Sequence, residues 1–438
     1  SPAEAVTIDT LQVRINLTHA QVDDLTIALI APDGSRHPIP RTSGATKEAM
    51  LAIYRIDGLK GTSTTGTWSL EVRDTVTNQT VGMLHNWRLL VNRPVPQTDW
   101  SGHGTHVAGT AVGDDAGVGD AAPGPFAGVA PEADIVMVRA YRETTSVLDD
   151  DFVLGLAWID ALAGVLGRPY VVSYAHAGWA HAHDGTAPHE RAIDALVGPG
   201  KPGKVVVTSA GADAGPPVHA RGTFAPGDET IALEVPPDTP QIQLDLYFPD
   251  PADARVGIVF PQTDGVTCVN RSSLTDEQSG CDPLPLTPGG YRQILLLRGG
   301  TVLNTVQVSW IERDPYNGLF DLWVEFFGWQ GAPVVPGRWA VRVVGGQGQW
   351  DAWSSPGGLL VAGAPGMSVS SPSTARHAIA VGDHVTRVEW TDESGARQRQ
   401  TETVGDLDSY SPRGPTRDDR PKPDLTAPGT WIISARAG

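Results

Sequence analysis

The sequence predicts an α/β protein in which helices cover a parallel sheet, with one β-sandwich ahead of it and a second inserted in it. Continuous apolar runs alternate with helical periods over residues 98–215 and again over 365–438, as in parallel strands buried on both faces. Residues 1–92 and 216–364 instead alternate apolar and polar side chains, which is the period of half-buried strands. Abundant glycine (50) and proline (36) favour loop-rich architectures of this kind.

Composition limits the classes of partner. A chain of 438 residues is long enough for two or three domains. A net charge of -18 disfavours nucleic acid and anionic membrane surfaces as partners. No apolar run reaches the roughly 18 residues needed to span a bilayer, and the region after Ser1 carries no signal segment. The chain therefore looks mature or trimmed. Because an acidic surface favours solubility outside cells, we expect a secreted extracellular protein, with association to the cell surface as the alternative.

Cys268 and Cys281 are the two cysteines. They are too few for a disulfide framework and lack histidines at zinc-ligand spacing. The favoured interpretation is one small-loop disulfide formed in an oxidising compartment, and two buried thiols are the alternative.

The first ninety residues carry a recognisable set of motifs. Strand patterns at Leu11–Ile15 and Leu25–Leu29 are followed by the turn Pro32–Gly34, and then by Gly66–Leu70 and Trp87–Leu89. The last three of these, together with Thr18-His19 and Asp24–Ile27, resemble the P domain of proprotein convertases. The resemblance implies a β-sandwich over 1–92 that supports an adjacent protease and holds no catalytic residue. Arg93–Pro96 reads as a stiff linker, because each proline fixes its own φ.

The α/β part is interrupted. Residues 98–215 form its first part, 216–364 an inserted β-sandwich, and 365–438 an incomplete second part. The expected strands are Ile135–Val138, Tyr170–Val172, Val205–Val207 and His377–Gly382, and the expected helices are Phe152–Leu166 and Glu190–Leu196.

The strongest motif is Ser101–Thr110, with the sequence SGHGTHVAGT. It resembles the histidine motif of subtilisin-like serine peptidases, the subtilases or peptidase family S8, along its whole length. In that family the first histidine, here His103, is the general base, since an imidazole can accept and return a proton near neutral pH. Gly128–Ala133 and Lys422–Gly429 also resemble segments of this family.

The other two triad residues are missing from this pattern. The family carries Asp-Thr-Gly or Asp-Ser-Gly ahead of the histidine motif, whereas Asp9 precedes a threonine without the glycine, and Asp99 matches a loop-shaping position. No Gly-Thr-Ser-Met-Ala follows Gly429. The Gly-Thr-Ser at Gly61–Ser63 belongs to a turn of the predicted P domain.

Two further positions depart from the family. The oxyanion asparagine is replaced by Ala212, whose methyl cannot donate a hydrogen bond. In subtilisin the loss of such a donor costs about 10²–10³-fold in turnover. The family's substrate-cleft wall is replaced by Ala175, His176, Ala177 and Gly178.

These departures predict that the chain alone is inactive. Without the strand of the acid and the helix of the serine, a sheet edge stays unpaired. Either a partner chain supplies this strand and helix, or the sequence is a fragment. We therefore expect a protein or peptide substrate, or a partner chain that completes the fold. The alternative is a non-catalytic pseudopeptidase acting as a binding or structural module. A third hypothesis has Trp329, Trp350 and Trp353 stack on sugars, although core packing suits them better.

No cofactor is predicted, and no metal site is assigned. His176, His181 and His183 near Asp184 could bind zinc, but loop histidines of this kind are expected to face solvent. Asp149–Asp151 reads as a solvated helix start, with calcium as the alternative.

Overall fold

The computed structural model divides into two compact units, Ser1–Val165 with Ser434–Gly438, and Leu166–Ile433. The structure describes residues 6–19, 24–39, 49–76, 82–92, 99, 101–114, 127–140, 149–212, 217–224, 228–249, 254–261, 265–271, 277–279, 283–285, 291–311, 313–355, 357–392 and 394–436. The predicted linker Arg93–Pro96 and Cys281 lie outside these ranges.

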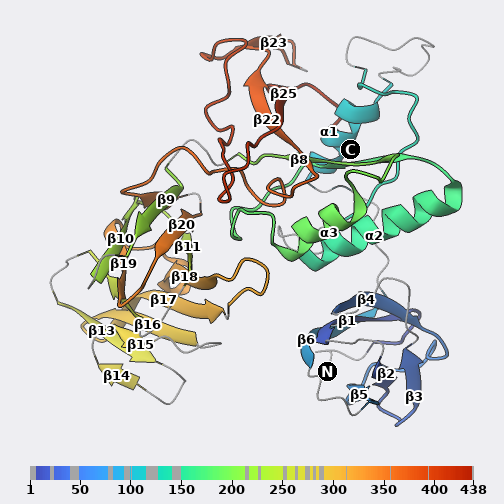
Figure 1. The fold of residues 1–438 in the computed structure, drawn as a ribbon, viewed down its shortest axis with the longest axis horizontal. Helices are drawn as coiled ribbons and strands as arrows, with labels where there is room; N and C mark the ends of the chain where they lie inside the picture. Colours follow the sequence, from blue (N-terminus) through green and yellow to red (C-terminus); the bar gives the residue numbers. More distant parts are fainter. Residues whose placement is uncertain are drawn as a thin grey trace. The chain divides into compact units, whose positions relative to one another are not determined.

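The first unit opens with a β-sandwich of two three-stranded sheets, ordered β4-β1-β6 and β3-β2-β5 (Figure 1). The strands are β1 (Leu11–His19), β2 (Leu25–Ile30), β3 (Arg36–Ile39), β4 (Ala49–Ile56), β5 (Ser69–Asp74) and β6 (Gly82–Val91). Alternate residues of β1, Leu11, Val13 and Ile15, are buried in the shared core. The alternation predicted for 1–92 is therefore the inside-outside pattern of this sandwich.

Two helices follow in the same unit, α1 (His103–Val112) and α2 (Asp149–Leu166). Asp149, Asp150 and Asp151 lie in the first turn of α2, where carboxylates interact favourably with the helix dipole. The helix predicted at Phe152–Leu166 is present with this acidic start.

The strand predicted at Ile135–Val138 was wrong. Residues 134–140 form no strand, and Ile135, Val136 and Met137 are 55%, 46% and 60% exposed. An apolar run becomes a strand only where a neighbouring strand satisfies its backbone groups, and among the described residues none pairs with it.

The second unit contains a four-stranded sheet in the order β25-β22-β8-β7. Its strands are β7 (Tyr170–Tyr174), β8 (Lys204–Ser209), β22 (Ile379–Val385) and β25 (Leu425–Thr430), and the helix α3 (Pro188–Leu196) connects β7 to β8. All three strand pairs are parallel. The predicted strands at Tyr170–Val172, Val205–Val207 and His377–Gly382 correspond to β7, β8 and β22.

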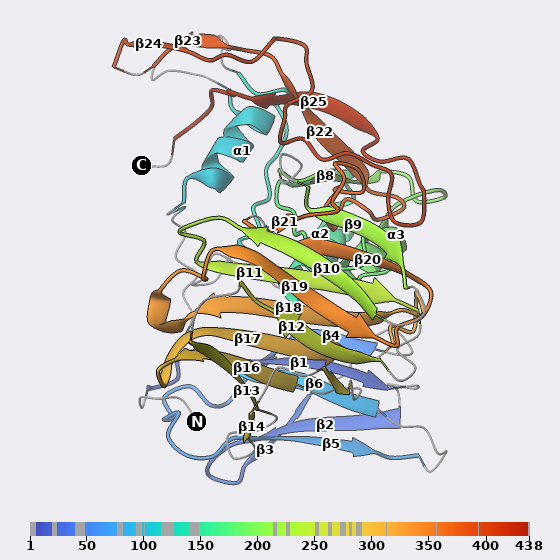
Figure 2. The same ribbon diagram turned by 90° about the vertical axis from the view of Figure 1, so that its left-hand side faces the viewer.

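The insert is an antiparallel sandwich of a five-stranded sheet, β15-β12-β19-β10-β21, and an eight-stranded sheet, β14-β13-β16-β17-β18-β11-β20-β9 (Figure 2). The strands are β9 (His219–Thr223), β10 (Asp228–Val235), β11 (Gln241–Phe248), β12 (Arg255–Val259), β13 (Val266–Arg271), β14 (Glu277–Ser279), β15 (Leu284–Pro285), β16 (Tyr291–Arg298), β17 (Thr301–Ile311), β18 (Phe320–Gly328), β19 (Gly337–Val344), β20 (Gln349–Ser354) and β21 (Leu359–Leu360). A short 3-10 helix, η2, spans Trp329–Gly331, and a hairpin of β23 (Glu389–Thr391) and β24 (Arg397–Arg399) follows β22.

The core of the insert forms between its sheets. On β11 the residues Ile242, Leu244, Leu246 and Phe248 are fully buried, and Trp339 of β19 joins them. The residues between them on β11 point to the other face of the eight-stranded sheet. That outer face is also covered, by segments of the α/β part in the same unit.

Cys268 on β13 is disulfide-bonded, as the favoured interpretation predicted. Among the described residues, no helix is long and apolar enough to cross a membrane.

Candidate functional site

His103 is the first residue of α1, and Gly102 before it adopts φ 78°, in the left-handed region that glycine tolerates. Gly102 has no side chain that could cap the helix. Asp99 takes that role: its Oδ1 accepts the amide of Gly102 at 3.0 Å and its Oδ2 accepts the amide of Thr105 at 2.6 Å. The conformation at His103 is thus set by the glycine and by a carboxylate four residues earlier.

Asp99 is held ionised by these contacts. Hydrogen bonds from Thr105, with further ones from Ser101 and Gly102, lower the pKa of the Asp99 carboxyl to about 2. The loop-shaping role considered for Asp99 in the sequence agrees with this geometry.

The far end of α1 is closed by the predicted turn at Gly128–Ala133. Val129 N and Ala130 N donate to the carbonyl oxygens of Thr110 and Ala111 at 3.2 and 2.9 Å. The Ser434 hydroxyl donates to the His106 carbonyl at 2.8 Å. None of the ten residues of α1 is buried, although its side chains are mostly small and apolar. A helix of this composition normally packs its apolar face against other elements.

The predicted oxyanion position lies in the second unit. Ala212 follows β8 and is exposed. Gly211 before it has φ 112°, and a Cβ placed there would lie 2.4 Å from Ser370 Oγ, so this turn requires glycine. The structure therefore keeps a tight turn here, and the residue that follows it carries only a methyl group.

The predicted cleft wall, Ala175–Gly178, follows β7, the neighbour of β8. Gly178 N and Ser371 N each donate to the other residue's carbonyl oxygen, at 2.8 and 2.9 Å. The rings of Tyr174 and His176 contact edge to face, with centroids 5.9 Å apart. The structure places this wall and Ala212 in the segments that follow two adjacent parallel strands of one unit, whereas His103 belongs to the other unit.

Ser63 and Asp9, the serine and aspartate compared with the missing triad residues, lie in the N-terminal β-sandwich. Ser63 is exposed and forms a single bridge with Thr7, and its hydroxyl is 2.8 Å from that of Thr65. Asp9 forms an exposed ion pair with Lys60 at 2.6 Å. Both side chains thus contact neighbours within this sandwich.

The histidines weighed as a zinc site do not form one group. His183 is buried, so the expectation that it faces solvent was wrong. Its Nδ1 lies 2.7 Å from the carbonyl oxygen of Val369, its Nε2 lies 2.6 Å from that of Trp179, and its ring stacks on Trp353. These contacts commit both ring nitrogens of His183 to backbone oxygens.

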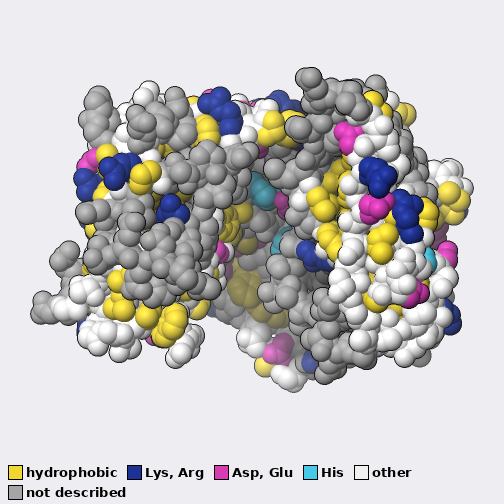
Figure 3. Space-filling view, turned by 90° about the horizontal axis from the view of Figure 1, so that it is seen from below, with side chains coloured by type: hydrophobic (Ala, Val, Ile, Leu, Met, Phe, Trp, Pro, Cys, Tyr) yellow, Lys and Arg dark blue, Asp and Glu magenta, His cyan; other side chains and the backbone are white. Residues whose placement is uncertain are grey.

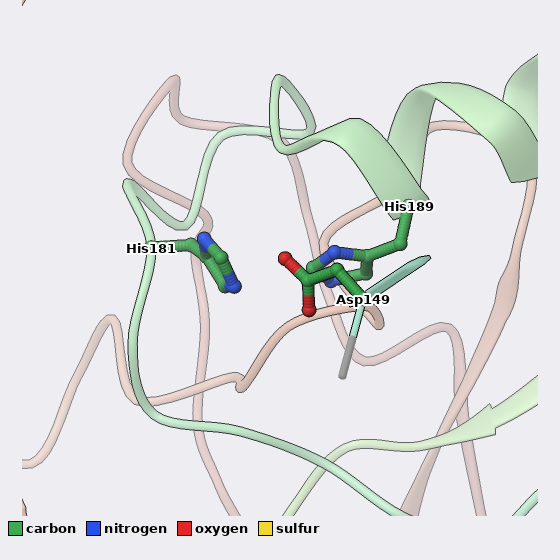
Figure 4. A group of neighbouring side chains, drawn as sticks. All are labelled: Asp149, His181 and His189. Atoms are coloured by element: carbon green, nitrogen blue, oxygen red, sulfur yellow. The ribbon is translucent and has the colours of Figure 1, made fainter. Parts of the chain in front are cut away.

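His181 instead lies near His189 at the start of α3, with ring centroids 4.9 Å apart (Figure 4). His189 is buried, and its Nε2 is 2.6 Å from the hydroxyl of Ser371, which donates to Glu190 at 2.8 Å. The serine of this Ser-His-Glu group is only 2% exposed, so no substrate can reach it. The group is a buried network that ties α3 to the segment ahead of β22.

The tryptophans of the sugar-stacking hypothesis are mostly core residues. Trp350 and Trp353 are 4% and 1% exposed, and the Trp353 indole donates to the Met367 carbonyl at 2.9 Å. Of the three, only Trp329 is exposed, at 41%. A stacking platform made of these residues is therefore excluded.

The sequence did not single out the buried ion cluster where the insert meets the α/β part. Asp351 on β20 is fully buried and accepts His219 Nε2 at 2.9 Å, Arg221 Nε at 2.7 Å and Arg417 Nε at 3.0 Å. Arg417 also reaches Asp184, at 3.4 Å. Burial pushes the pKa of the Asp351 carboxyl up, but hydrogen bonds from His219 and Arg221 outweigh it and keep the pKa below its usual value.

Comparisons with known proteins agree with part of this description. Residues 8–91 match the proprotein convertase P-domain family. Over 80 residues, or 18% of each chain, the sequence is 30% identical to leupeptin-inactivating enzyme 1 of Streptomyces exfoliatus.

The fold is similar to that of the CspB protease of Clostridium perfringens, with a TM-score of 0.55 and 22% identity over 78% of this chain and 64% of that one. The chain thus spans less than two thirds of the length of these relatives. Residues 8–91 are a P domain, and 78% of the chain shares its fold with a protease.

Proposed function

We propose that this chain is a scaffold of a subtilisin-type serine endopeptidase that acts outside the cell, with His103 as its general base, and that the chain by itself is inactive. The observation that carries the proposal is the local geometry of the SGHGTHVAGT motif. The left-handed Gly102 and the ionised Asp99 fix the first turn of α1 and place His103 at its exposed start. A P domain and a protease-like fold in the same chain support this reading.

Inactivity of the chain alone follows from the chemistry it lacks. A Ser-His-Asp mechanism needs a nucleophile within hydrogen-bond reach of the imidazole and an acid on its other nitrogen. The serine and aspartate candidates in this sequence, Ser63 and Asp9, occupy structural positions in the P-domain sandwich. Ala212 also removes a donor for the oxyanion.

We further propose that the strand of the acid and the helix of the serine come from outside these 438 residues, either from a partner chain or from a further part of the same protein. Among the described strands, β7 pairs with β8 alone, and Val171 on β7 is 68% exposed, although strands of parallel sheets are normally covered on both faces. In the other unit, Ile135 and Met137 are exposed on an unpaired extended segment. Hydrophobic side chains reach the surface on the face shown in Figure 3.

Secretion is supported by the disulfide at Cys268, because such bonds persist in oxidising compartments. The acidic net charge of -18 favours protein or peptide partners over nucleic acid.

The test has two arms. The purified 438-residue chain is treated with a serine-directed fluorophosphonate, and covalent labelling would overturn its inactivity. Native material is then analysed by denaturing intact mass for an associated polypeptide carrying Asp-Thr-Gly and Gly-Thr-Ser. With that partner, labelling must appear and must disappear in His103→Ala, while His106→Ala serves as the matched control on the same helix.

The second candidate is a non-catalytic binding module, which Ala212 and the altered wall at Ala175–Gly178 favour. A folded monomer of this chain that binds peptides without labelling, and finds no completing partner, would decide for it.

A further inference from the structure

The outer face of the eight-stranded sheet carries two neighbouring carboxyl groups, that of the buried Asp245 and that of the half-buried Asp321, whose Oδ1 is buried. Asp245 and Tyr247 lie on β11 and Asp321 lies on β18, where Tyr247 and Asp321 are directly paired. Because Leu244 and Leu246 point into the core of the insert, the residues between them point away from it. Asp245 is nevertheless only 1% exposed. The residues 179–187, which follow the predicted cleft wall, contribute to its cover.

The hydrogen bonds made by described residues satisfy only one oxygen of each carboxyl group. Asp245 Oδ2 accepts the amide of His181 at 3.0 Å and the hydroxyl of Tyr247 at 3.0 Å, and the same hydroxyl lies 3.4 Å from Asp321 Oδ2. Oδ1 of Asp245 and Oδ1 of Asp321 are buried and have no hydrogen-bond partner among the described residues. Neither carboxyl forms an ion pair with a described residue.

The surrounding charges do not compensate two anions. Asp314 approaches Asp321 from the loop after β17, and Asp184 approaches Tyr247 from the 179–187 segment. Arg417 is engaged by Asp184 and Asp351. His181 contributes its backbone amide. Two ionised carboxylates buried in such surroundings repel one another, and one proton held between them removes that penalty.

We propose that Asp245 and Asp321 share one proton, and that this proton fastens residues 179–187 to the inserted sandwich. When the proton is lost, the two carboxylates repel, and the acceptor that holds the His181 amide is displaced. Because Gly178 is bonded to Ser371 on one side and leads into this segment on the other, the release also loosens the predicted cleft wall. The inference concerns the contact between insert and α/β part, and it stands whether or not the chain belongs to a peptidase.

The direction of the pH response follows from the geometry. Burial, with Asp245 as the second cause, raises the pKa of Asp321 well above its usual range. The pKa of Tyr247 is also raised by burial and by both carboxyls, so its hydroxyl remains a donor. A carboxyl that stays protonated in the folded state contributes most in acid. Its contribution is lost as the pH rises from about 3.9, the value in unfolded chains, through the raised pKa.

Hydrogen exchange of the peptide covering residues 179–187 tests the proposal at pH 5 and pH 9, with rates corrected for intrinsic exchange. Asp321→Asn places an amide donor beside Asp245 at every pH. The matched control is Asp228→Asn, which removes one carboxylate from the other sheet of the insert, where it pairs with Arg342. In wild type and in Asp228→Asn, the protection factor of this peptide should fall at least about tenfold from pH 5 to pH 9, since each pKa unit corresponds to about a factor of ten. Asp321→Asn should lose less than about twofold, because its donor does not titrate.

An equal loss in Asp321→Asn and wild type overturns the proposal. Recovery of wild-type protection at pH 9 on adding calcium also overturns it, because a cation would then occupy the place given to the proton. Infrared spectroscopy of the wild type at pH 7 needs no variant to fold. The carbonyl stretch of a protonated carboxylic acid must be present, and its absence refutes the shared proton.

Discussion

Replacing Asp351 by alanine should be among the most destabilising single changes in the second unit. The carboxylate has no exposed surface and receives nitrogen donors from His219, Arg221 and Arg417. Its removal leaves up to three polar or cationic groups without their shared acceptor, and breaking a buried pair in this way costs about 3–5 kcal/mol. The free energy of unfolding in urea, followed by tryptophan fluorescence, measures the loss, and hydrogen exchange locates it at β9 and β20.

The control for this prediction is Asp228→Ala, which breaks an ion pair with Arg342 in the same sandwich. Side-chain exposures of 40% and 43% for these two residues predict a loss of at most about 1 kcal/mol. If the two variants differ by less than about 1 kcal/mol, the buried cluster does not hold the insert as argued. The lowered pKa of Asp351 also sets the direction of the pH dependence. The carboxylate contributes fully to the free energy of unfolding above about pH 3.9, and this contribution is lost as the pH falls through the lowered pKa.

Four other changes follow from the same structure. Leu246→Ala, in the core of the insert, should cost about 2–5 kcal/mol of unfolding free energy, and a loss under 1 would contradict the packing described. Asp99→Ala should weaken α1 by about 1 kcal/mol, seen as faster exchange at Gly102–Thr105. In wild type the same effect should appear only as the pH falls towards about 2. Reducing the disulfide at Cys268 should cost about 2–5 kcal/mol, read from urea midpoints with and without reductant. Ala212→Asn should leave the chain alone inactive but raise turnover about 10²–10³-fold once a completing partner is bound, and no gain would remove the oxyanion role from this position.

The hydrophobic periodicity of the sequence correctly predicted the strands whose pairing partners lie close in sequence or carry the same apolar pattern. The alternation of Ile242–Leu246 became β11, and the apolar runs at Tyr170 and Val205 became the paired strands β7 and β8. The same reasoning failed at Ile135–Val138, because a strand depends on a partner that its own residues do not specify. A local pattern gives a preference, and pairing decides the outcome.

The buried polar residues could not be predicted for a different reason. Alternation placed Asp245 and Asp351 opposite the core, where polar residues ordinarily face water. The structure covers that face with residues that come from distant parts of the sequence, such as His181 and Arg417. One feature of the sequence did point to this region, because the HAHD stretch at His181–Asp184 places three titratable groups within four residues. No neighbouring residue indicated that these groups would be buried.

The two carboxyl sites on this outer face respond to pH in opposite directions. Asp351 contributes when it is ionised, so acid weakens it, whereas the Asp245–Asp321 pair contributes when it holds a proton, so alkali weakens it. The attachment of the insert to the α/β part should therefore be tightest at intermediate pH. Asp351→Ala should remove the acid limb of this profile and Asp321→Asn the alkaline limb. Hydrogen exchange of residues 179–187 across pH 3 to 9 separates the two limbs, and a profile in which either variant shifts both limbs together would show that the sites act as one network.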